Sequence, residues 1–308
     1  MAAVEGFDTS RPNIARVYDY WLGGKDHYPA DRELAEKIRE INPGVPAMAR
    51  DNRAFALAAV TRAAESGIAQ FLDLGAGLPT RPAICEAARA VSPAARIAYV
   101  DFDPVVINHA TALLANKTGI AAALADLTDP DAVLTHPAVT EVIDFSQPVC
   151  MVFASVLHFV DADAARRVTA EYASRAAAGS QLAVSVVHVA SEQMLTTPAS
   201  VYTAGTFFNH GEPEITGWLS GWELLPPGVA EARRWVAGIE GGAPADATAW
   251  MLCAVAAKPW LRPPGTGQPP ISATAWPSPS SHPERGHRAV FSAVFSARGR
   301  QHWGPPAT

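Results

Sequence analysis

The chain has 308 residues, of which 49% are hydrophobic and 18% are charged, and its formal net charge at pH 7 is −6. This balance is typical of a globular protein and leaves room for one large domain or two small ones. The sequence contains no run of the ~18 apolar residues that a membrane helix needs. An acidic chain also has no bulk electrostatic reason to bind nucleic acid or an anionic membrane, so we expect neither as a partner.

Residues 1–68 have a mostly helical pattern, which includes the amphipathic stretches PADRELAEKIREI and AMARDNRAFALAAVTRAAESG. A dinucleotide-binding domain usually begins at its first strand, so this region is too long to be a simple lead into one. We therefore predict that 1–68 form an N-terminal helical cap.

The start of the chain, MAAVEGFDTSRPN, lacks a basic region followed by an apolar run, which argues against a signal peptide. Cys85, Cys150 and Cys253 are widely spaced, and no CxxC pair is present. We expect three reduced thiols in a cytoplasmic protein.

Residues 69–258 alternate short apolar runs with amphipathic stretches, which predicts a Rossmann-like α/β domain with a parallel sheet covered by helices. The expected strands are 69–74, 96–101, 119–124, 149–154 and 182–189. The expected helices are 80–91, 104–116, 130–136 and 161–178. After a long connection, GWELLPP and TAWMLCAVAAK predict two late strands that add an antiparallel edge to the sheet.

Residues 259–308 differ from the rest of the chain in composition. They hold ten of the 26 prolines, and five Arg with one Glu give them a charge of +4. Such a segment cannot bury enough apolar surface to offset the entropy lost on ordering. We predict a disordered Pro/Ser-rich tail.

The stretch QFLDLGAGLPT joins a buried strand to a glycine turn made by Asp73, Gly75, Ala76 and Gly77. A glycine directly after a strand allows a tight turn, and a second one lets a ligand approach the main chain. The turn alone is a weak signal, because a flexible connection would explain it equally well.

Two further acids follow strands of the same predicted sheet. Asp101 ends the second strand 24 residues after Gly77, where a carboxylate can bind two ribose hydroxyls. Asp126 follows the third strand, where it either accepts from an adenine amino group or caps the helix that begins in DPDAV. Because the carboxyl ends of parallel strands meet at one edge, these residues predict a nucleoside site there.

The glycine turn fits S-adenosylmethionine better than NAD. Thr80 stands where G-x-G-x-x-G has its last glycine, and Pro79 has no N–H to offer a phosphate. Asp73 would repel a pyrophosphate but suits a positively charged ligand. S-adenosylmethionine carries a sulfonium, an ammonium, a ribose and an adenine, and no phosphate. We therefore predict it as the cofactor.

The stretches LDLGAG, YVDFDP and ADLTDP, together with the late strand pair, resemble the class I S-adenosylmethionine-dependent methyltransferases. ARVYDYWLGGKDHYPADRELAEKI, DNRAF, VLHFVDAD and GWELLPPGV resemble, in the same order, the bacterial (actinobacterial-type) S-adenosyl methyltransferase family, formerly a domain of unknown function. The similarity covers roughly residues 10–258. It implies a sheet of seven strands with the last one antiparallel.

The resemblance also implies how the cofactor is held. Gly75 and Gly77 would pass beneath the methionine part, and Asp101 would bind the ribose. The backbone of Ala154 and Ser155, at the end of the fourth strand, would face the methionine amino group. The residues implied around the adenine follow the second and third strands: Phe102, Asp103, Asp126 and Leu127.

His158, in VLHFVDAD, is the candidate general base, because it follows the fourth strand and its ordinary pKa suits proton transfer near neutral pH. Alternatively, it bonds to local backbone and holds the loop. In LGGKDH, Gly24 allows close approach and Lys25 is a candidate partner for the cofactor carboxylate, with a solvated lysine as the alternative. Arg50 and Arg53 are further candidates for that carboxylate.

No spacing of the nine histidines matches a metal-binding motif, and the sequence has neither a P-loop nor a G-x-S-x-G elbow. The sequence therefore predicts a methyltransferase that acts on a small molecule. A non-catalytic protein that binds S-adenosylmethionine or a related nucleoside would share every cofactor residue and stays an alternative. An NAD-dependent oxidoreductase is a second alternative, disfavoured by Thr80 and Asp73.

Overall fold

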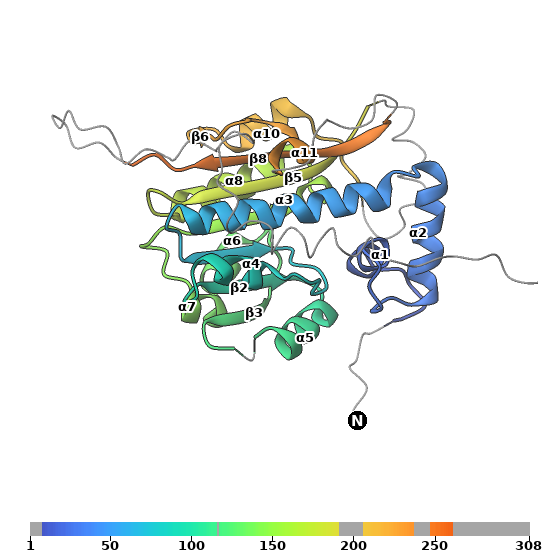
Figure 1. Ribbon diagram of the computed structural model, residues 1–308, viewed down its shortest axis with the longest axis horizontal. Helices are drawn as coiled ribbons and strands as arrows, with labels where there is room; N and C mark the ends of the chain where they lie inside the picture. The colour runs from blue at the N-terminus through green and yellow to red at the C-terminus, as the bar shows by residue number, and fades with distance from the viewer. Residues whose placement is uncertain (1–7, 116, 191–205, 237–246, 261–308) are drawn as a thin grey trace, which may run out of the picture.

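The computed structural model of the chain describes residues 8–115, 117–190, 206–236 and 247–260. Its centre is an eight-stranded sheet in the order β3-β2-β1-β4-β5-β8-β6, and β7 also pairs with β8 (Figure 1). The strands are β1 (Gln70–Leu74), β2 (Arg96–Asp101), β3 (Ile120–Leu124), β4 (Cys150–Ala154), β5 (Gln181–Val189), β6 (Glu223–Leu224), β7 (Ala230–Glu231) and β8 (Ala249–Ala257).

Strands β1 to β5 run parallel, whereas β8 is antiparallel to β5 and pairs in the same manner with β6 and β7. The predicted α/β class, the parallel body and the antiparallel last strand are thus confirmed. The nine-residue β8 lies between β5 and the two-residue β6, because its apolar sequence AWMLCAVAA suits an inner strand.

Helices cover both faces of the sheet (Figure 1). One face carries α3, α4 and α11, and the other carries α6, α7, α8 and α10. The 3-10 turn η1 (Leu157–Phe159) follows β4. The helices are α1 (Ile14–Trp21), α2 (Pro29–Ile41), α3 (Val45–Glu65), α4 (Ile84–Val91), α5 (Pro104–Leu113), α6 (Pro130–Leu134), α7 (Pro137–Val142), α8 (Ala162–Arg175), α10 (Glu212–Trp218) and α11 (Ala232–Trp235).

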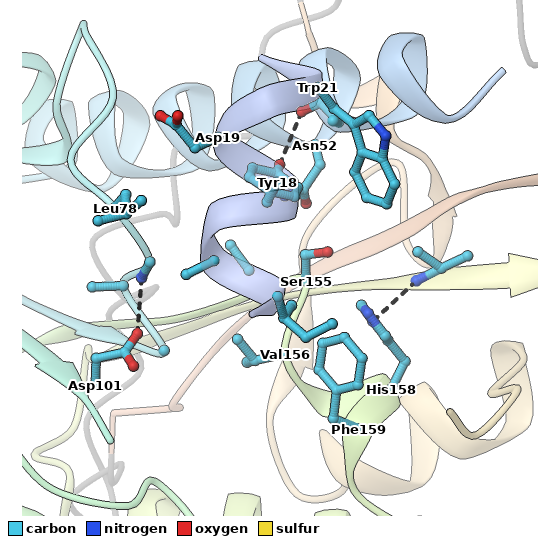
Figure 2. Close-up of a pocket in the computed structure, with 18 of the residues that line it drawn as sticks. Tyr18, Asp19, Trp21, Asn52, Leu78, Asp101, Ser155, Val156, His158 and Phe159 are labelled. Carbon is cyan, nitrogen blue, oxygen red and sulfur yellow. Dashed lines mark hydrogen bonds between the residues drawn. The ribbon is translucent and has the colours of Figure 1, made fainter. Parts of the chain in front are cut away.

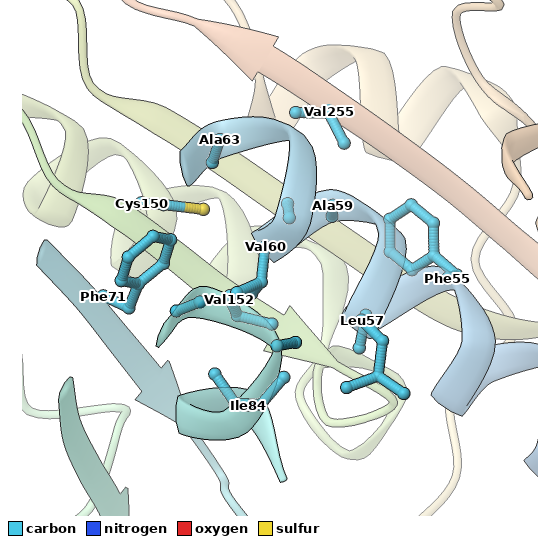
Figure 3. Packing of buried hydrophobic residues seen from close by; sticks show 14 of the residues in the cluster. Phe55, Leu57, Ala59, Val60, Ala63, Phe71, Ile84, Cys150, Val152 and Val255 are labelled. Carbon is cyan, nitrogen blue, oxygen red and sulfur yellow. The ribbon is translucent and has the colours of Figure 1, made fainter. Parts of the chain in front are cut away.

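The core has two halves because successive side chains of a strand point to opposite faces of the sheet. In β4, Val152 packs in the cluster with α3 and α4, while its neighbour Phe153 packs in the cluster with α8. Figure 3 shows the first cluster, in which Phe55 and Val60 of α3 lie with Ile84 of α4. Strands buried on both faces have nearly continuous apolar sequences, which explains why these strands could be predicted from the sequence.

The three N-terminal helices belong to two different packing units. The long helix α3 is buried around most of its circumference from Ala54 to Ala64, because the sheet, α4 and α11 all contact it. Helices α1 and α2 instead have a small cluster of their own, made by Val17, Leu34, Ala35 and Ile38. The region 1–68 therefore contains one helix of the sheet core and a separate helical pair. The domain division of the sequence analysis stays a prediction.

A buried ion pair joins α1 to α2. Arg16 Nε donates to Asp31 Oδ2 at 2.8 Å, and the Asp31 side chain is fully buried. The same carboxylate accepts the backbone N–H groups of Asn13 at 2.8 Å and Tyr28 at 2.7 Å. Asn13 Nδ2 in turn donates to Asp103 Oδ2 at 2.6 Å, just after β2. The helical pair is thereby fastened to the carboxyl edge of the sheet.

Other parts of the chain bear on the remaining expectations. The cysteines Cys85, Cys150 and Cys253 are all buried and free. Of the predicted disordered tail 259–308, only residues 259 and 260 belong to the described residues. Across the described ranges, no helix combines the length and the apolar character needed to cross a membrane.

Candidate functional site

A cavity of about 560 Å³ lies at the carboxyl ends of the parallel strands, bounded by α1, α2 and the start of α3 (Figure 2). The strand order reverses between β1 and β4, which are neighbours in the sheet but not in the chain. Ligands of open α/β sheets bind at such a switch point. Of the site residues that the sequence predicts, all but Gly24, Lys25 and Arg50 line this cavity.

The glycine turn has the backbone that its sequence predicts. Gly75 and Gly77 have φ angles of +74° and +63°, in the left-handed region that favours glycine. A Cβ at Gly75 would overlap the Val156 side chain and would also meet Leu127. The N–H of Gly77 donates to Asp101 Oδ2 at 2.9 Å, so the turn is fastened to the end of β2. Gly75, Ala76 and Gly77 all line the cavity, so a ligand there can lie against the main chain of the turn.

Asp73 presents a nearly unsolvated carboxylate to the cavity. Its side chain is in the cavity lining, the residue is only 5% exposed, and no hydrogen bond reaches the carboxylate from the described residues. Burial raises the pKa of Asp73 to about 6, with a partly opposing effect from Arg53 and a smaller raising effect from Asp101. A buried carboxylate without a partner is costly unless a cation binds to it. The site therefore favours a positively charged ligand.

The end of β2 combines a carboxylate with an aromatic face. Asp101 Oδ1 accepts the N–H of Asp103 at 2.9 Å, and its Oδ2 accepts from the glycine turn, so each oxygen keeps a lone pair for a ligand. Burial raises the pKa of Asp101. Phe102 lines the cavity although it is 71% exposed, which leaves an apolar ring free to stack against a flat ligand. Asp103 caps α5 by accepting the N–H of Val105 at 2.7 Å.

The residues after β3 show which aspartate caps α6, and so test one of the two interpretations of Asp126. The cap of α6 is Asp129, whose Oδ1 accepts the N–H of Ala132 at 3.0 Å. Asp126 lines the cavity and accepts from both the N–H and the hydroxyl of Thr128, each at 2.8 Å, through Oδ1. Helix capping therefore does not explain Asp126. Leu127 lines the cavity beside it.

The end of β4 carries backbone strain. Ser155 has a φ of +62°, a left-handed conformation that is uncommon for a residue with a Cβ. Its N–H donates to both the carbonyl and the Oγ of Ser185 in β5, each at 3.0 Å. Ala154 and Ser155 both line the cavity. Strain of this kind persists where surrounding bonds hold it, and it is frequent at functional sites.

A buried polar network joins this strained turn to the helices. Ser185 Oγ donates to Asn52 Oδ1, Asn52 Nδ2 donates to the Tyr18 hydroxyl at 2.8 Å, and that hydroxyl donates to the Ala49 carbonyl at 2.9 Å. Asn52 lines the cavity, yet the sequence analysis gave it no role. An asparagine within an Ala-rich apolar helix was the available signal, because such a side chain needs buried partners.

The basic candidates are separated by the fold. Arg53 lines the cavity and donates to the carbonyls of Thr80 at 3.0 Å and Pro82 at 2.7 Å. Its Nε is buried and has no hydrogen-bond partner among the described residues. Arg50 and Lys25 are exposed and lie outside the cavity lining. The arrangement therefore supports Arg53, and not Lys25, as the partner for a ligand carboxylate.

Gly24 also lies outside the cavity. We expected it to allow a ligand to approach the main chain, but the group that lies close to it is a side chain of the protein. A Cβ at Gly24 would overlap the Asp19 carboxylate. Asp19 lines the cavity and accepts the N–H of Asp26 at 2.9 Å. Burial raises the pKa of Asp19. The LGGKDH loop thus wraps an aspartate that the sequence analysis did not single out.

His158 lies in η1 at the cavity wall and is 3% exposed. Its Nδ1 accepts the N–H of Val187 at 3.4 Å, and its carbonyl accepts the N–H of Phe208 at 2.8 Å (Figure 2). Burial lowers the pKa of His158 to about 3, and His210 lowers it further. The imidazole is therefore neutral and carries its proton on Nε2. This geometry supports a hydrogen-bond donor rather than the general base that the sequence suggested.

The lining as a whole matches the parts of S-adenosylmethionine. Asp73 suits its positive charges, Asp101 its ribose hydroxyls, and Phe102 its adenine, while Arg53 suits its carboxylate. The glycine turn lets the ligand lie against the main chain. Among the residues that the structure describes, no group of three or more His, Cys, Asp or Glu is arranged to hold a metal ion.

Comparisons with known proteins agree with this match. The profile of the family described as S-adenosyl methyltransferase matches residues 2–259. The crystal structure of a proposed methyltransferase from Thermobifida fusca YX is 35% identical, with a TM-score of 0.75, and the alignment covers 83% of this chain and 98% of that one. A DUF574 family protein from Streptomyces avermitilis MA-4680 is 34% identical, with a TM-score of 0.77 and coverage of 82% and 99%. No curated protein matches the chain.

The family match spans most of the chain, and both crystal structures align with it almost over their full length. The chain therefore belongs to the S-adenosyl methyltransferase family and is an S-adenosylmethionine-dependent methyltransferase.

Proposed function

We propose that the cavity holds S-adenosylmethionine at the ends of β1 to β4 and that the methyl acceptor is a small molecule bound beside it under α1, α2 and α3. The observation that carries the proposal is the pair of buried carboxylates, Asp73 and Asp101, on either side of a glycine turn in one cavity. Asp73 has no partner within the described chain, and Asp101 keeps free lone pairs.

The proposed contacts follow from the chemistry of each side chain. Asp101 accepts from the ribose hydroxyls, and Phe102 and Leu127 border the adenine. Asp73 offsets the positive charges, and Arg53 pairs with the carboxylate. Further proposed contacts are those of the glycine turn, of the β3 end and of the β4 end: Gly75, Ala76, Gly77, Asp103, Asp126, Ala154 and Ser155.

The bound cofactor supplies a methyl group that is already activated by the sulfonium. The protein's contribution is therefore to position the acceptor and to exclude water from it. Helices α1 and α2 lie across the cavity, and the tie from Asn13 to Asp103 keeps them there. A cavity of about 560 Å³ is within the range of small-molecule sites. This size supports a small acceptor, and the three free, buried cysteines agree with the proposed cytoplasmic location.

The proposal is tested by calorimetric titration of the purified protein with S-adenosylmethionine, S-adenosylhomocysteine and NAD. We expect the first two to bind and NAD not to bind. Asp101→Ala should weaken binding by about tenfold to a hundredfold, or about 1.4–2.7 kcal/mol, because it removes two hydrogen bonds to a charged acceptor. Asp129→Ala is the matched control, since Asp129 caps α6 outside the cavity.

Asp129→Ala should leave the affinity for S-adenosylmethionine within about twofold of the wild type, because its cost falls on helix capping. Equal losses in the two variants would mean that Asp101 acts through the fold and not through the ligand. Binding of NAD in place of the methionine nucleosides would overturn the proposal.

A further inference from the structure

The cavity has two chemically different sides that meet at the end of β4. Strands β1, β2 and β3 lie on one side of β4, and β5 and β8 lie on the other. In Figure 2, Leu78 and Asp101 lie on one side of Ser155 and Val156, and Trp21, His158 and Phe159 lie on the other. We call the second part the apolar side. Its described lining includes Trp21, Ile41, Met48, Phe159, Val187 and Met251.

Charge is confined to the cofactor side. Asp73 is the next-to-last residue of β1 and Asp101 is the last of β2. Asp103 and Asp126 follow β2 and β3, and Arg53 bonds to the loop after the glycine turn. Asp19 comes from α1, but in Figure 2 it lies on the same side of Ser155 as Leu78 and Asp101. Among the described residues that line the apolar side, none is Asp, Glu, Lys or Arg. A ligand there loses its water without gaining a charged partner, so most of its surface must be apolar.

Of the described residues that border the apolar side, His158 and Tyr18 are ionisable, and neither can accept a proton. The Nδ1 lone pair of His158 is engaged by Val187, and burial lowers the pKa of this histidine to about 3. The Tyr18 hydroxyl donates to Ala49 and accepts from Asn52, and burial raises its pKa to about 12. An acceptor bound here therefore has to arrive with its reacting lone pair already free.

His158 offers a polar contact to such an acceptor. With Nδ1 engaged, His158 offers its Nε2–H, which has no hydrogen-bond partner among the described residues. An aliphatic amine is a poor match, because it is protonated near neutral pH and its single lone pair would have to face both the methyl group and the histidine. An ionised oxygen has several lone pairs, so it can accept from His158 and still react.

We infer that the methyl acceptor is a largely apolar molecule that carries an ionised oxygen, a carboxylate or an acidic phenolate, and that His158 Nε2–H positions this oxygen. The inference rests on the proposed function of the same cavity. The acceptor oxygen forms a bond to the methyl carbon while the carbon–sulfur bond breaks, and the pair of that bond stays on sulfur. The step moves no proton. The negative oxygen and the positive sulfonium yield two groups that are neutral at the reacting atoms.

The test uses three probes that share one apolar body: naphthalene-2-carboxylate, naphthalene-2-carboxamide and protonated naphthalen-2-ylmethanamine. Each is titrated by calorimetry into protein saturated with sinefungin, an S-adenosylmethionine analogue that keeps a positive charge near the sulfonium position. We expect the carboxylate to bind at least about tenfold more tightly than the carboxamide, because a charge-assisted hydrogen bond is roughly twice as strong as a neutral one. The ammonium probe should not bind measurably.

Variants separate the donor from the fold. His158→Phe keeps an aromatic ring but loses the Nε2–H, and should weaken the carboxylate probe by about tenfold, the loss of one hydrogen bond to a charged group. His158→Gln keeps a donor, and should stay within about threefold of the wild type. His188→Phe is the matched control, because His188 lies in β5 outside the cavity lining and should leave both ligands unchanged. Sinefungin affinity should be unaffected by all three variants.

The outcomes are distinguishable. Tighter binding of the ammonium than of the carboxylate, or no binding of any probe while sinefungin is bound, would overturn the inference and leave the proposed function intact. A carboxylate affinity that His158→Phe does not change would also overturn it. Failure of sinefungin itself to bind would instead count against the proposed function. Where the carboxylate binds, S-adenosylmethionine should convert it to the methyl ester, detected by mass spectrometry.

Discussion

The two sides of the cavity are built in different ways. The cofactor side consists of short turns that directly follow β1, β2, β3 and β4, and backbone N–H groups fasten them to one another. The apolar side combines α1, the end of α2, the start of α3 and strands β5 and β8, which are far apart in the chain. The cofactor side is polar, and each of its turns is a short stretch of sequence next to a strand. The apolar side is formed by side chains from helices and strands that lie far apart in the chain.

The difference means that the two sides of the cavity are held in place by different parts of the fold. Residues at strand ends are held by the sheet, whose interior is buried and rigid, so their spacing in the sequence carries the function. Side chains on α1 and α2 rest on a small cluster of four buried residues, so the acceptor side depends on a weaker unit. The predictions below test this dependence.

The largest effect is expected from Asp31→Ala, which acts on the acceptor side. It removes the carboxylate that pairs with Arg16 and accepts two backbone N–H groups, and breaking such a buried pair costs about 3–5 kcal/mol. We expect faster hydrogen exchange in α1 and α2, loss of the carboxylate probe, and a smaller loss of S-adenosylmethionine affinity.

The control for this change is Glu33→Ala in the same helix, because Glu33 is exposed and pairs only with Lys37 at the surface. Its effect on stability should stay below about 0.5 kcal/mol. Unchanged exchange in Asp31→Ala would mean that the ion pair does not hold the two helices in place.

The second largest effect is expected from Gly75→Ala on the cofactor side. A left-handed alanine costs about 1–2 kcal/mol, and its Cβ would also overlap Val156. Calorimetry should show S-adenosylmethionine bound about tenfold to a hundredfold more weakly. Gly221→Ala is the matched control, because its φ of +83° is also in the left-handed region, no atom beyond its chain neighbours lies within 4 Å of the added Cβ, and Gly221 is outside the cavity lining.

Gly221→Ala should leave the affinity within about twofold of the wild type, because its conformational cost falls on the fold and not on the cavity. Adding Val156→Ala to Gly75→Ala should recover part of the affinity, since it removes the overlapping group. An equal loss of affinity in Gly221→Ala would show that the effect of Gly75→Ala comes from the fold and not from the cavity.

A third, moderate effect concerns the pH dependence of cofactor binding. Asp73 has a pKa of about 6 in the free protein, and a cationic ligand binds its ionised form. Below this pKa the carboxylate has to lose a proton first, so affinity should fall by up to about tenfold per pH unit as the pH decreases from about 6. Asp73→Asn should bind more weakly and show a flatter profile in calorimetric titrations.

The same raised pKa has a consequence for stability without ligand. The folded protein holds the Asp73 proton more tightly than the unfolded chain, so this group's contribution to stability is full below about pH 4 and is lost as the pH rises through about 6. Between these limits the unfolding free energy of the wild type should fall, relative to Asp73→Asn, by on the order of 2–3 kcal/mol. Parallel denaturation curves for both proteins at all pH values would contradict this assignment.

The smallest effect is expected from Tyr18→Phe, which cuts the network between the two sides. It removes the bond to the Ala49 carbonyl and the acceptor for Asn52, and chemical denaturation should show a loss of about 1 kcal/mol. Tyr20→Phe in the same helix is the control, because its hydroxyl bonds to Glu36 near the surface. A greater loss in the control would show that the buried network contributes little.

Much of the fold could be predicted because the strands are buried on both faces. Such strands read as short apolar runs between turns, and the structure places β1, β2, β3, β4 and β5 within one residue of the expected bounds. The single helix expected at 130–136 is instead α6 followed by α7, because His136 starts a new helix before Pro137. Helix ends are decided by capping bonds, which a periodic pattern does not show.

The site was predicted only where it is local. Asp73, Asp101 and Asp126 were identified because each lies at or just after the end of a strand, and the parallel sheet brings strand ends together. Lys25 was placed at the cavity by its proximity to Gly24, but the loop wraps Asp19 and leaves the lysine exposed. The direction of a loop side chain depends on tertiary packing, which spacing does not encode.

The sequence by itself determined the α/β sheet, the glycine turn and the carboxylates at the strand ends, because these follow from local patterns of burial and turn chemistry. Three properties became visible only in the folded chain. Asn52 joins β5 to α1, His158 is a neutral donor, and the apolar side lies beside the cofactor side. Those properties arise from desolvation and from contacts between distant segments. Both depend on the complete packing of the chain.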